Sequence, residues 1–142
     1  MLTRSGPGAT DVALLVLRIA VGLVFIVYGF AKVSHLPGTA ALWTRLHLPA
    51  PAIMGPVQGV VEFLGGILVV LGLLTRPVAV LLALDMVGAL VLVRIPHSAF
   101  QGGYALEWQA LMIAVSLALA GAGAFSLDRL RRRGAVRHPL VS

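Results

Sequence analysis

The chain of 142 residues has no cysteine and very little charge. Without a thiol it cannot form a disulfide scaffold, a thiol–disulfide relay, an iron–sulfur cluster or a thiolate metal site. Charged residues make up 11% of the sequence, against about a quarter in an average soluble domain. Hydrophobic residues make up 59%, and the mean hydropathy is +1.00. A soluble domain of this size could not bury so much apolar surface, so the composition indicates an integral membrane protein.

Acidic residues are the scarcer charged type, with 5 Asp and Glu against 11 Lys and Arg. An excess of basic residues can mark a protein that binds nucleic acid. Here the excess is concentrated near the C-terminus, where five arginines lie close together: Arg129, Arg131, Arg132, Arg133 and Arg137. A basic cluster beside a membrane span is typical of a cytoplasmic tail that contacts anionic lipid. We therefore expect the lipid bilayer, and no nucleic acid, as a partner.

Four apolar segments organise the chain, each close to the length that a helix needs to cross the hydrocarbon core. They lie at about residues 12–33, 53–74, 78–95 and 106–125. The first segment is interrupted by Arg18, is too long for a signal peptide and has no cleavage pattern after it, so we expect it to be retained. The sequence predicts an all-α fold, an integral membrane four-helix bundle over residues 12–128. Residues 1–11 form a flexible tail and residues 129–142 a basic tail.

Four spans place both chain termini on the same side of the membrane. With both termini in the cytoplasm, the inner side carries seven basic residues, namely Arg4, Arg76 and the five of the basic tail. The outer side carries three: Lys32, Arg45 and Arg94. This distribution satisfies the positive-inside rule, so we predict cytoplasmic termini. Between the first two spans, about residues 39–48 are expected to form a short helix in the headgroup region, because they include Trp43.

One face of the first span carries residues that do not suit lipid. Residues three or four apart share a helix face, and that spacing links Arg18, Gly22, Phe25, Gly29 and Lys32. The second and fourth spans have small-residue faces of the same kind, which allow close helix contact in lipid. We expect these faces to point toward protein or toward a water-filled cavity.

Six ionisable residues fall within the predicted spans and are candidates for ligand binding or proton handling: Arg18, Lys32, Glu62, Asp85, Arg94 and Glu107. From the rise of about 1.5 Å per helical residue, three of them lie near the outer ends of their spans. The sequence therefore predicts an outer cluster of Lys32, Arg94 and Glu107, with Glu62 beneath it. It also predicts an inner pair of Arg18 and Asp85.

Ionisable residues inside a membrane mark a ligand site or a proton path, because each is costly unless it is paired. A structural interpretation is also open. Arg18 can extend to the inner headgroups, and Lys32 and Arg94 can anchor at the outer surface. Pairing with Arg18 would explain Asp85. Glu62 lies too deep to reach water, so it is paired or protonated.

The set of motifs resembles the DoxX family of small membrane proteins from bacteria and archaea. The resemblance covers about residues 12–128. It rests on motifs in three of the spans and on the turn after the second: Arg18-x3-Gly22-x2-Phe25-x3-Gly29-x2-Lys32, Glu62-x2-Gly65-Gly66, Gly72-Leu73-Leu74-Thr75-Arg76, Glu107 and Ser126-Leu127-Asp128.

The resemblance implies a four-helix, multi-pass protein of the plasma (inner) membrane. Members that give the family its name are associated with thiosulfate:quinone oxidoreductase, other members are regarded as oxidoreductases, and distant relatives resemble assembly factors. The positions that this likeness selects for testing are Arg18, Lys32, Glu62 and Glu107. The absence of cysteine here argues against a thiol-based version of that chemistry.

Three hypotheses for function remain open. The first is a redox-associated subunit that handles a quinone or a similar lipophilic molecule between its helices. It has no covalently bound cofactor and no electron carrier of its own, so it needs a redox or other protein partner, and the sequence leaves open whether it is an enzyme. The second is a structural or assembly subunit of a membrane complex. The third is a small transporter or proton pathway built as a homo-oligomer. No metal site is expected, because the outer histidines are irregularly spaced: His35, His47 and His97.

Overall fold

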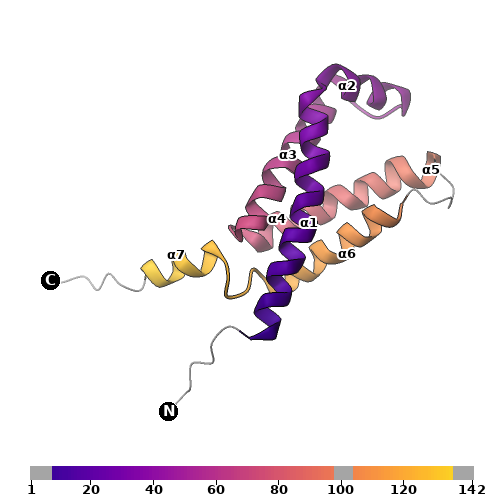
Figure 1. Cartoon of the computed structure of the whole chain (residues 1–142). Coiled ribbons are helices and arrows are strands. Elements are labelled where there is room, and N and C mark those ends of the chain that lie inside the picture. Colours follow the sequence, from indigo (N-terminus) through magenta and orange to yellow (C-terminus); the bar gives the residue numbers. More distant parts are fainter. Residues whose placement is uncertain (1–7, 98–103, 136–142) are drawn as a thin grey trace, which may run out of the picture.

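The computed structural model of the chain describes residues 8–97 and 104–135, which form helices and contain no strand (Figure 1). The predicted all-α fold is therefore confirmed for these residues. The elements in chain order are α1 (Ala9–Ser34), α2 (Leu36–Arg45), α3 (Pro51–Leu71), α4 (Thr75–Gly88), the π-helix η1 (Ala89–Arg94), the short α5 (Ile95–His97), α6 (Ala105–Ala120) and α7 (Leu127–Ala135).

Three helical segments are long and apolar enough to cross a membrane: α1, α3, and α4 together with η1. Helix α6 is apolar but has only 16 residues. The predicted fourth span is thus too long, because the helix ends at Ala120 and Gly121 adopts a φ of +85°. In the same way α3 ends at Leu71, where Gly72 has a φ of +70°. Glycine adopts these left-handed conformations without a Cβ clash, which is why both helices end there.

The predicted tails differ from the structure where they can be compared. Residues 9–11 belong to α1, and α7 begins at Leu127, two residues before the predicted basic tail. Residues 1–7 and 136–142 of the predicted tails lie outside the described residues. The short helix predicted between the first two spans is present as α2, with bounds three residues earlier than expected.

Helices α1 and α3 pack closely through glycine, as the small-residue faces predicted. A Cβ atom added at Gly66 would lie 2.7 Å from the carbonyl oxygen of Gly22. A Cβ added at Gly29 would meet the backbone of Phe63. Larger side chains at these positions would force the helices apart. Since lipid offers no hydrophobic force between helices, this close van der Waals contact is what holds the pair together.

The chain forms two helix pairs, because α1 packs chiefly against α3 and α4 packs chiefly against α6. A core of buried apolar side chains joins them, with Phe25 from α1, Val69 from α3, Leu82 from α4 and Leu117 from α6. Large apolar side chains cover the outward faces of all four helices. This arrangement, with glycine and charged residues inside beside an apolar core and with Leu, Val and Ile on the outward faces, suits a lipid environment.

Candidate ligand pocket between the helices

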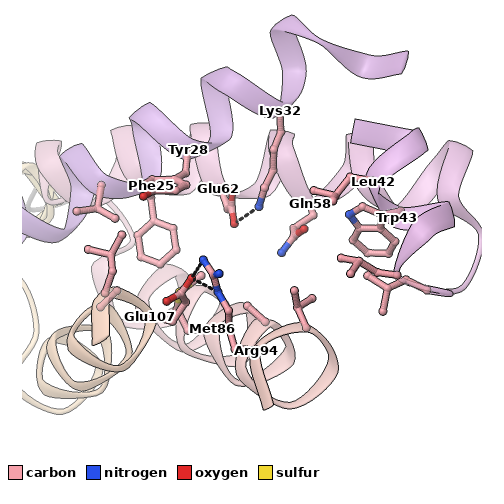
Figure 2. A pocket seen from close by; sticks show the side chains of 17 residues that line it. Phe25, Tyr28, Lys32, Leu42, Trp43, Gln58, Glu62, Met86, Arg94 and Glu107 are labelled. Carbon is pink, nitrogen blue, oxygen red and sulfur yellow. Dashed lines mark hydrogen bonds and ion pairs between the residues drawn. The ribbon is translucent and has the colours of Figure 1, made fainter. Parts of the chain in front are cut away.

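A cavity of about 420 Å³ lies between the helices at the end of the molecule where α1 ends (Figure 2). We call this the Lys32 end. The size is within the range of small-molecule sites. Most of the wall is apolar or aromatic: Val24, Phe25, Tyr28, Leu42, Trp43, Leu46, Leu48, Met86, Ala89, Val93, Leu106 and Ala110. Five polar residues complete it: Lys32, Gln58, Glu62, Arg94 and Glu107.

Helix α2 forms part of this wall and is fixed to both α1 and α3. The Thr39 hydroxyl donates to the carbonyl oxygens of Lys32 and His35, at 3.0 and 3.2 Å. On α3, Gly55 leaves room for α2, because a Cβ there would lie 2.9 Å from Thr39 Cγ2 and 3.3 Å from Trp43 Cδ1. The indole of Trp43 is therefore held against α3 at the pocket.

Lys32 and Glu62 form an ion pair across the α1–α3 interface, with Nζ 2.6 Å from Oε1. Glu62 is 2% exposed and Lys32 is 26% exposed. The lysine stem can cross α3 because Gly59 has no side chain, and a Cβ there would lie 2.8 Å from Lys32 Cβ. The glycine spacing that brings the helices together thus also positions this ion pair.

Arg94 and Glu107 form a second ion pair, which links η1 to α6. Nη2 and Nε of Arg94 lie 2.6 and 2.7 Å from Oε1 of Glu107. Arg94 is the last residue of the π-helix η1, in which each turn is wider than in an α-helix. Pro96 follows, and its missing N–H removes the donor that would bond the Leu92 carbonyl in an α-helix. The predicted outer cluster is therefore divided into two separate pairs on facing walls of the pocket.

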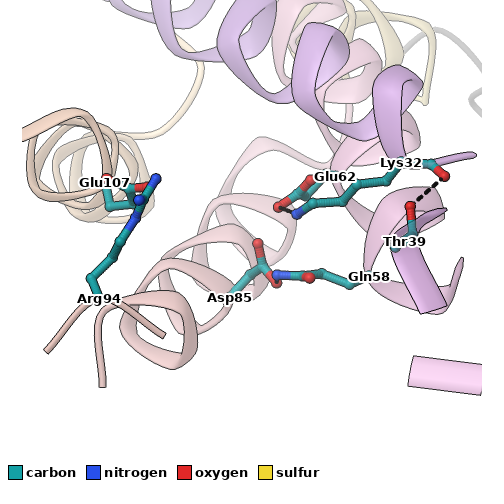
Figure 3. A network of polar contacts seen from close by, with 7 residues as sticks. All are labelled: Lys32, Thr39, Gln58, Glu62, Asp85, Arg94 and Glu107. Carbon is teal, nitrogen blue, oxygen red and sulfur yellow. Dashed lines mark hydrogen bonds and ion pairs between the residues drawn. The ribbon is translucent and has the colours of Figure 1, made fainter. Parts of the chain in front are cut away.

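Asp85 belongs to this end of the molecule and not to an inner pair with Arg18. Its Oδ1 accepts a hydrogen bond of 3.0 Å from Nε2 of Gln58, and its carboxyl group faces that of Glu62 (Figure 3). Helix α4 begins at Thr75, three residues before the predicted span, so Asp85 lies deeper than expected. Gln58 was not among the predicted site residues. Its position four residues before Glu62, on the same helix face, is the signal that could have identified it.

Arg18 donates four hydrogen bonds to backbone carbonyl groups and lies away from the pocket. It is 1% exposed. Its guanidinium donates to the carbonyl oxygens of Val69 at 3.1 Å, Val70 at 2.9 Å, Ala122 at 2.6 Å and Phe125 at 2.7 Å. The prediction of an Arg18–Asp85 pair is wrong, and so is the alternative in which Arg18 extends to the headgroups. Arg18 instead ties the end of α3 to the segment after α6, and we call this region the Arg18 end.

Three buried carboxylate oxygens at the Lys32 end have no hydrogen-bond partner among the described residues: Oε2 of Glu62, Oδ2 of Asp85 and Oε2 of Glu107. An unsatisfied buried acceptor is costly, and more so when it is charged. Two of these residues, Glu62 and Glu107, line the pocket. The arrangement can therefore accept hydrogen bonds from a ligand, or hold a proton.

A second cavity of about 340 Å³ adjoins the first, between α3 and the α4–η1 segment. The two share Trp43, Leu48, Gln58, Ala89 and Val93 as lining residues. The outer walls of the second cavity include exposed apolar side chains of the lipid-facing surface: Val57, Leu81, Leu84 and Leu92. A lateral and mostly apolar cavity thus lies beside the pocket.

The candidate metal ligands stay apart where they can be located. Among the described side chains, which do not include that of His97, no three His, Asp or Glu residues come together as a group that could hold a metal ion. The absence of a metal site stays a prediction for the whole chain.

Comparison with known proteins gives a family and several relatives. A family model described as DoxX matches residues 13–95. The chain is similar to "Putative oxidoreductase CatD" of Bacillus subtilis (strain 168), with 34% identity over 118 residues, or 83% of this chain and 86% of the relative. It is also similar to "Inner membrane protein YphA" of Escherichia coli (strain K12), with 38% identity over 130 residues, or 85% and 91% of the two chains. "Inner membrane protein YqjF" of the same organism is 32% identical over 126 residues, or 84% and 92%. No solved structure gives a significant match.

Proposed function

This chain belongs to the DoxX family of membrane proteins, and from that premise we propose that it binds a quinone or a similar lipophilic carbonyl compound in the pocket at its Lys32 end. It acts as a redox-associated subunit of the bacterial inner membrane. Relatives named as inner membrane proteins support the location, and the name of the Bacillus subtilis relative supports a redox role.

The observation that carries this proposal is the combination of an apolar wall with opposed polar groups. The ring of a quinone would pack against Phe25, Tyr28 and Trp43, which line the pocket. Quinone oxygens accept hydrogen bonds, and Lys32 and Arg94 can donate them. The hydroxyl groups of the reduced form donate hydrogen bonds, which the unpartnered oxygens of Glu62 and Glu107 can accept. The residues present therefore suit both forms of such a ligand.

The chain's residues have distinct roles in this proposal. Lys32 and Arg94 orient the ligand oxygens and draw electron density toward them. Glu62 exchanges a proton at the ligand oxygen, since a positioned carboxyl group is an effective acid or base. Electrons come from a protein partner, because no residue in the chain is an electron carrier. The lateral cavity between α3 and α4–η1 gives the ligand an entry route from the membrane and accommodates a hydrocarbon tail.

We also propose that α6 completes a four-span topology with both termini in the cytoplasm. Its 16 residues extend about 24 Å, somewhat less than the thickness of the hydrocarbon core. A bilayer can thin locally around a short helix at a modest cost. The arginines of α7 would then lie on the cytoplasmic side, in agreement with the positive-inside rule.

Mass spectrometry of the intact protein released from its native membrane tests the ligand directly. We expect a bound quinone in the wild-type spectrum, and at least about tenfold weaker binding of added quinone by Glu62→Gln, because a hydrogen bond to a charged group is lost. Asp128→Asn is the matched control, since it makes the same change from carboxyl to amide outside the pocket. A protein that carries no quinone and binds none when quinone is added would contradict the proposal.

A structural role in a membrane complex is the second candidate, and the two ion pairs favour it. Each pair joins two helices, α1 to α3 and η1 to α6, so both can serve only to fix helix positions. In that case Glu62→Gln would lower the yield of a protein complex, and the same mass spectra would show a partner chain without a small molecule.

A further inference from the structure

The interior at the Lys32 end carries more acidic groups than basic ones. Among the described side chains, two cations face three carboxyl groups there, and each cation is already bound to one of the three: Lys32 to Glu62, and Arg94 to Glu107. Asp85 has no cation among the described residues and accepts one hydrogen bond from the neutral amide of Gln58. A fully ionised site would leave one uncompensated negative charge in a region of low polarity, which is strongly unfavourable.

The position of Asp85 suggests how that charge is removed. Its second oxygen, Oδ2, is buried and has no partner within the described part of the chain. The carboxyl groups of Glu62, on α3, and Asp85, on α4, face each other (Figure 3). Two ionised carboxylates in such proximity repel each other, whereas one proton held between them turns the repulsion into a hydrogen bond.

We propose that Glu62 and Asp85 form a carboxyl pair that shares one proton at neutral pH. The proton makes Oδ2 of Asp85 a donor toward the Glu62 carboxylate, while Glu62 keeps its ion pair with Lys32. The unpartnered Asp85 oxygen is then satisfied, and the interior becomes neutral. The charged and polar groups that face the pair are Lys32 from α1, Gln58 from α3, and the Arg94–Glu107 pair from η1 and α6.

The pair is also a proton store beside the pocket. Glu62 lines the pocket, and Asp85 lines the adjoining lateral cavity. When a basic oxygen of a bound molecule takes the proton, one O–H bond on the pair breaks, one O–H bond on that molecule forms, and both carboxylates are left ionised. This transfer rests on the proposed quinone site, whereas the sharing of the proton does not.

Infrared spectroscopy of the full chain in lipid tests the sharing without any ligand. A protonated carboxyl group has a carbonyl stretching band distinct from that of a carboxylate. We expect such a band in the wild type at neutral pH and its loss in Asp85→Asn, which removes one member of the pair. We also expect its loss in Glu62→Gln, because Lys32 is then free to pair with Asp85, which ionises. Asp128→Asn, which changes a carboxyl group outside the pocket, should keep the band.

Isotope labelling makes the test independent of whether the variants fold. The chain has five acidic residues, of which Asp11, Asp85 and Asp128 are aspartates. Labelling the aspartate side-chain carboxyl carbon with ¹³C should shift the band in the wild type. Asp128 does not contribute, because its pKa is lowered.

Three results would overturn the shared proton: a wild-type spectrum without the band, a band that survives in both variants, or a band lost in only one of them. The last would assign the proton to an isolated carboxyl group. Quinone binding is measured separately. A protein that shows the band but binds no quinone would support the shared proton and contradict the proposed function.

Discussion

The Arg18 end and the Lys32 end of the molecule use charged residues in opposite ways. At the Arg18 end, Arg18, Asp11 and Asp128 bind backbone groups: the guanidinium binds four carbonyl oxygens, Asp11 accepts from the N–H of Ala124, and Asp128 accepts from the N–H groups of Leu74 and Thr75. At the Lys32 end, the charged side chains bind other side chains, and each of the three carboxyl groups has one oxygen without a partner among the described residues.

The difference separates stability from ligand binding. Backbone groups are fixed by the helices, so a charge bound to several of them acts as a rigid tie between distant segments. Side-chain pairs can rearrange around a ligand, and their free acceptors make that favourable. We therefore expect substitutions of charged residues at the Arg18 end to change the free energy of unfolding, and substitutions of charged residues at the Lys32 end to change mainly ligand affinity and protonation.

The largest effect is expected for Arg18→Met. It removes a buried cation and leaves the carbonyl groups of Val70, Ala122 and Phe125 without this donor. The free energy of unfolding in lipid should fall by about 3–5 kcal/mol, because each buried acceptor that loses its partner costs about 1–3 kcal/mol. Arg45→Met, at an exposed position on α2, is the control and should change little. An Arg18→Met protein as stable as the wild type would contradict the conclusion that the Arg18 end stabilises the fold.

Gly29→Leu comes next and shows what holds the Lys32 end together. A side chain there would meet the Phe63 backbone and separate α1 from α3, at a cost of about 1–3 kcal/mol from overpacking. Unfolding measurements should detect this loss. Gly88→Ala is the control, because a Cβ at Gly88 has no heavy atom within 4 Å. Equal stabilities of the two variants would show that close helix contact is not required.

Asp128→Asn should have a smaller effect that depends on pH. Partial burial acts to raise the pKa of Asp128, but the N–H groups of Thr75 and Leu74, with the charge of Arg131, outweigh it and hold the pKa below its usual value. A lowered pKa means that the carboxylate stabilises the fold above about pH 4 and loses this contribution as the pH falls through the folded-state value. At neutral pH the substitution should cost about 1 kcal/mol, as for the loss of a helix cap.

Unfolding of the wild type and Asp128→Asn at several pH values measures this difference. It should shrink toward zero in acid, where the wild-type carboxyl group is protonated as well. A difference that stays constant with pH would mean that the carboxylate charge contributes nothing at this position.

The smallest effect is expected for the Arg94–Glu107 ion pair. The Arg94 side chain is 36% exposed, and ion pairs of this kind contribute about 0.2–1 kcal/mol. A double-mutant cycle with Arg94→Gln and Glu107→Gln should give a coupling energy in that range in the free energy of unfolding. A coupling energy of several kcal/mol would mean that this pair contributes to stability as strongly as the hydrogen bonds of Arg18.

The sequence predicted the helices and their inner faces well, because both depend on residue type and period. The small-residue faces that Gly22 and Gly29 form on α1, and Gly66 on α3, are buried as expected. The partner of Arg18 could not be predicted in this way, because its acceptors are backbone carbonyl groups exposed where α3 and α6 end at glycine. Residue types carry no sign of such acceptors. The proximity of Asp85 to Glu62 was missed for a related reason, since it depends on where α4 begins.

The four acceptors of Arg18 also have a consequence for how the chain is made. Val69 and Val70 leave the ribosome soon after α1, but Ala122 and Phe125 are synthesised more than 100 residues after Arg18. Until then the guanidinium resides in the bilayer with half of its partners. These bonds can therefore be completed only after the segment that follows α6 has been synthesised. A nascent chain that stops before Ala122 would keep an exposed cation among its helices, a feature by which proteolytic quality control can distinguish incomplete copies from finished ones.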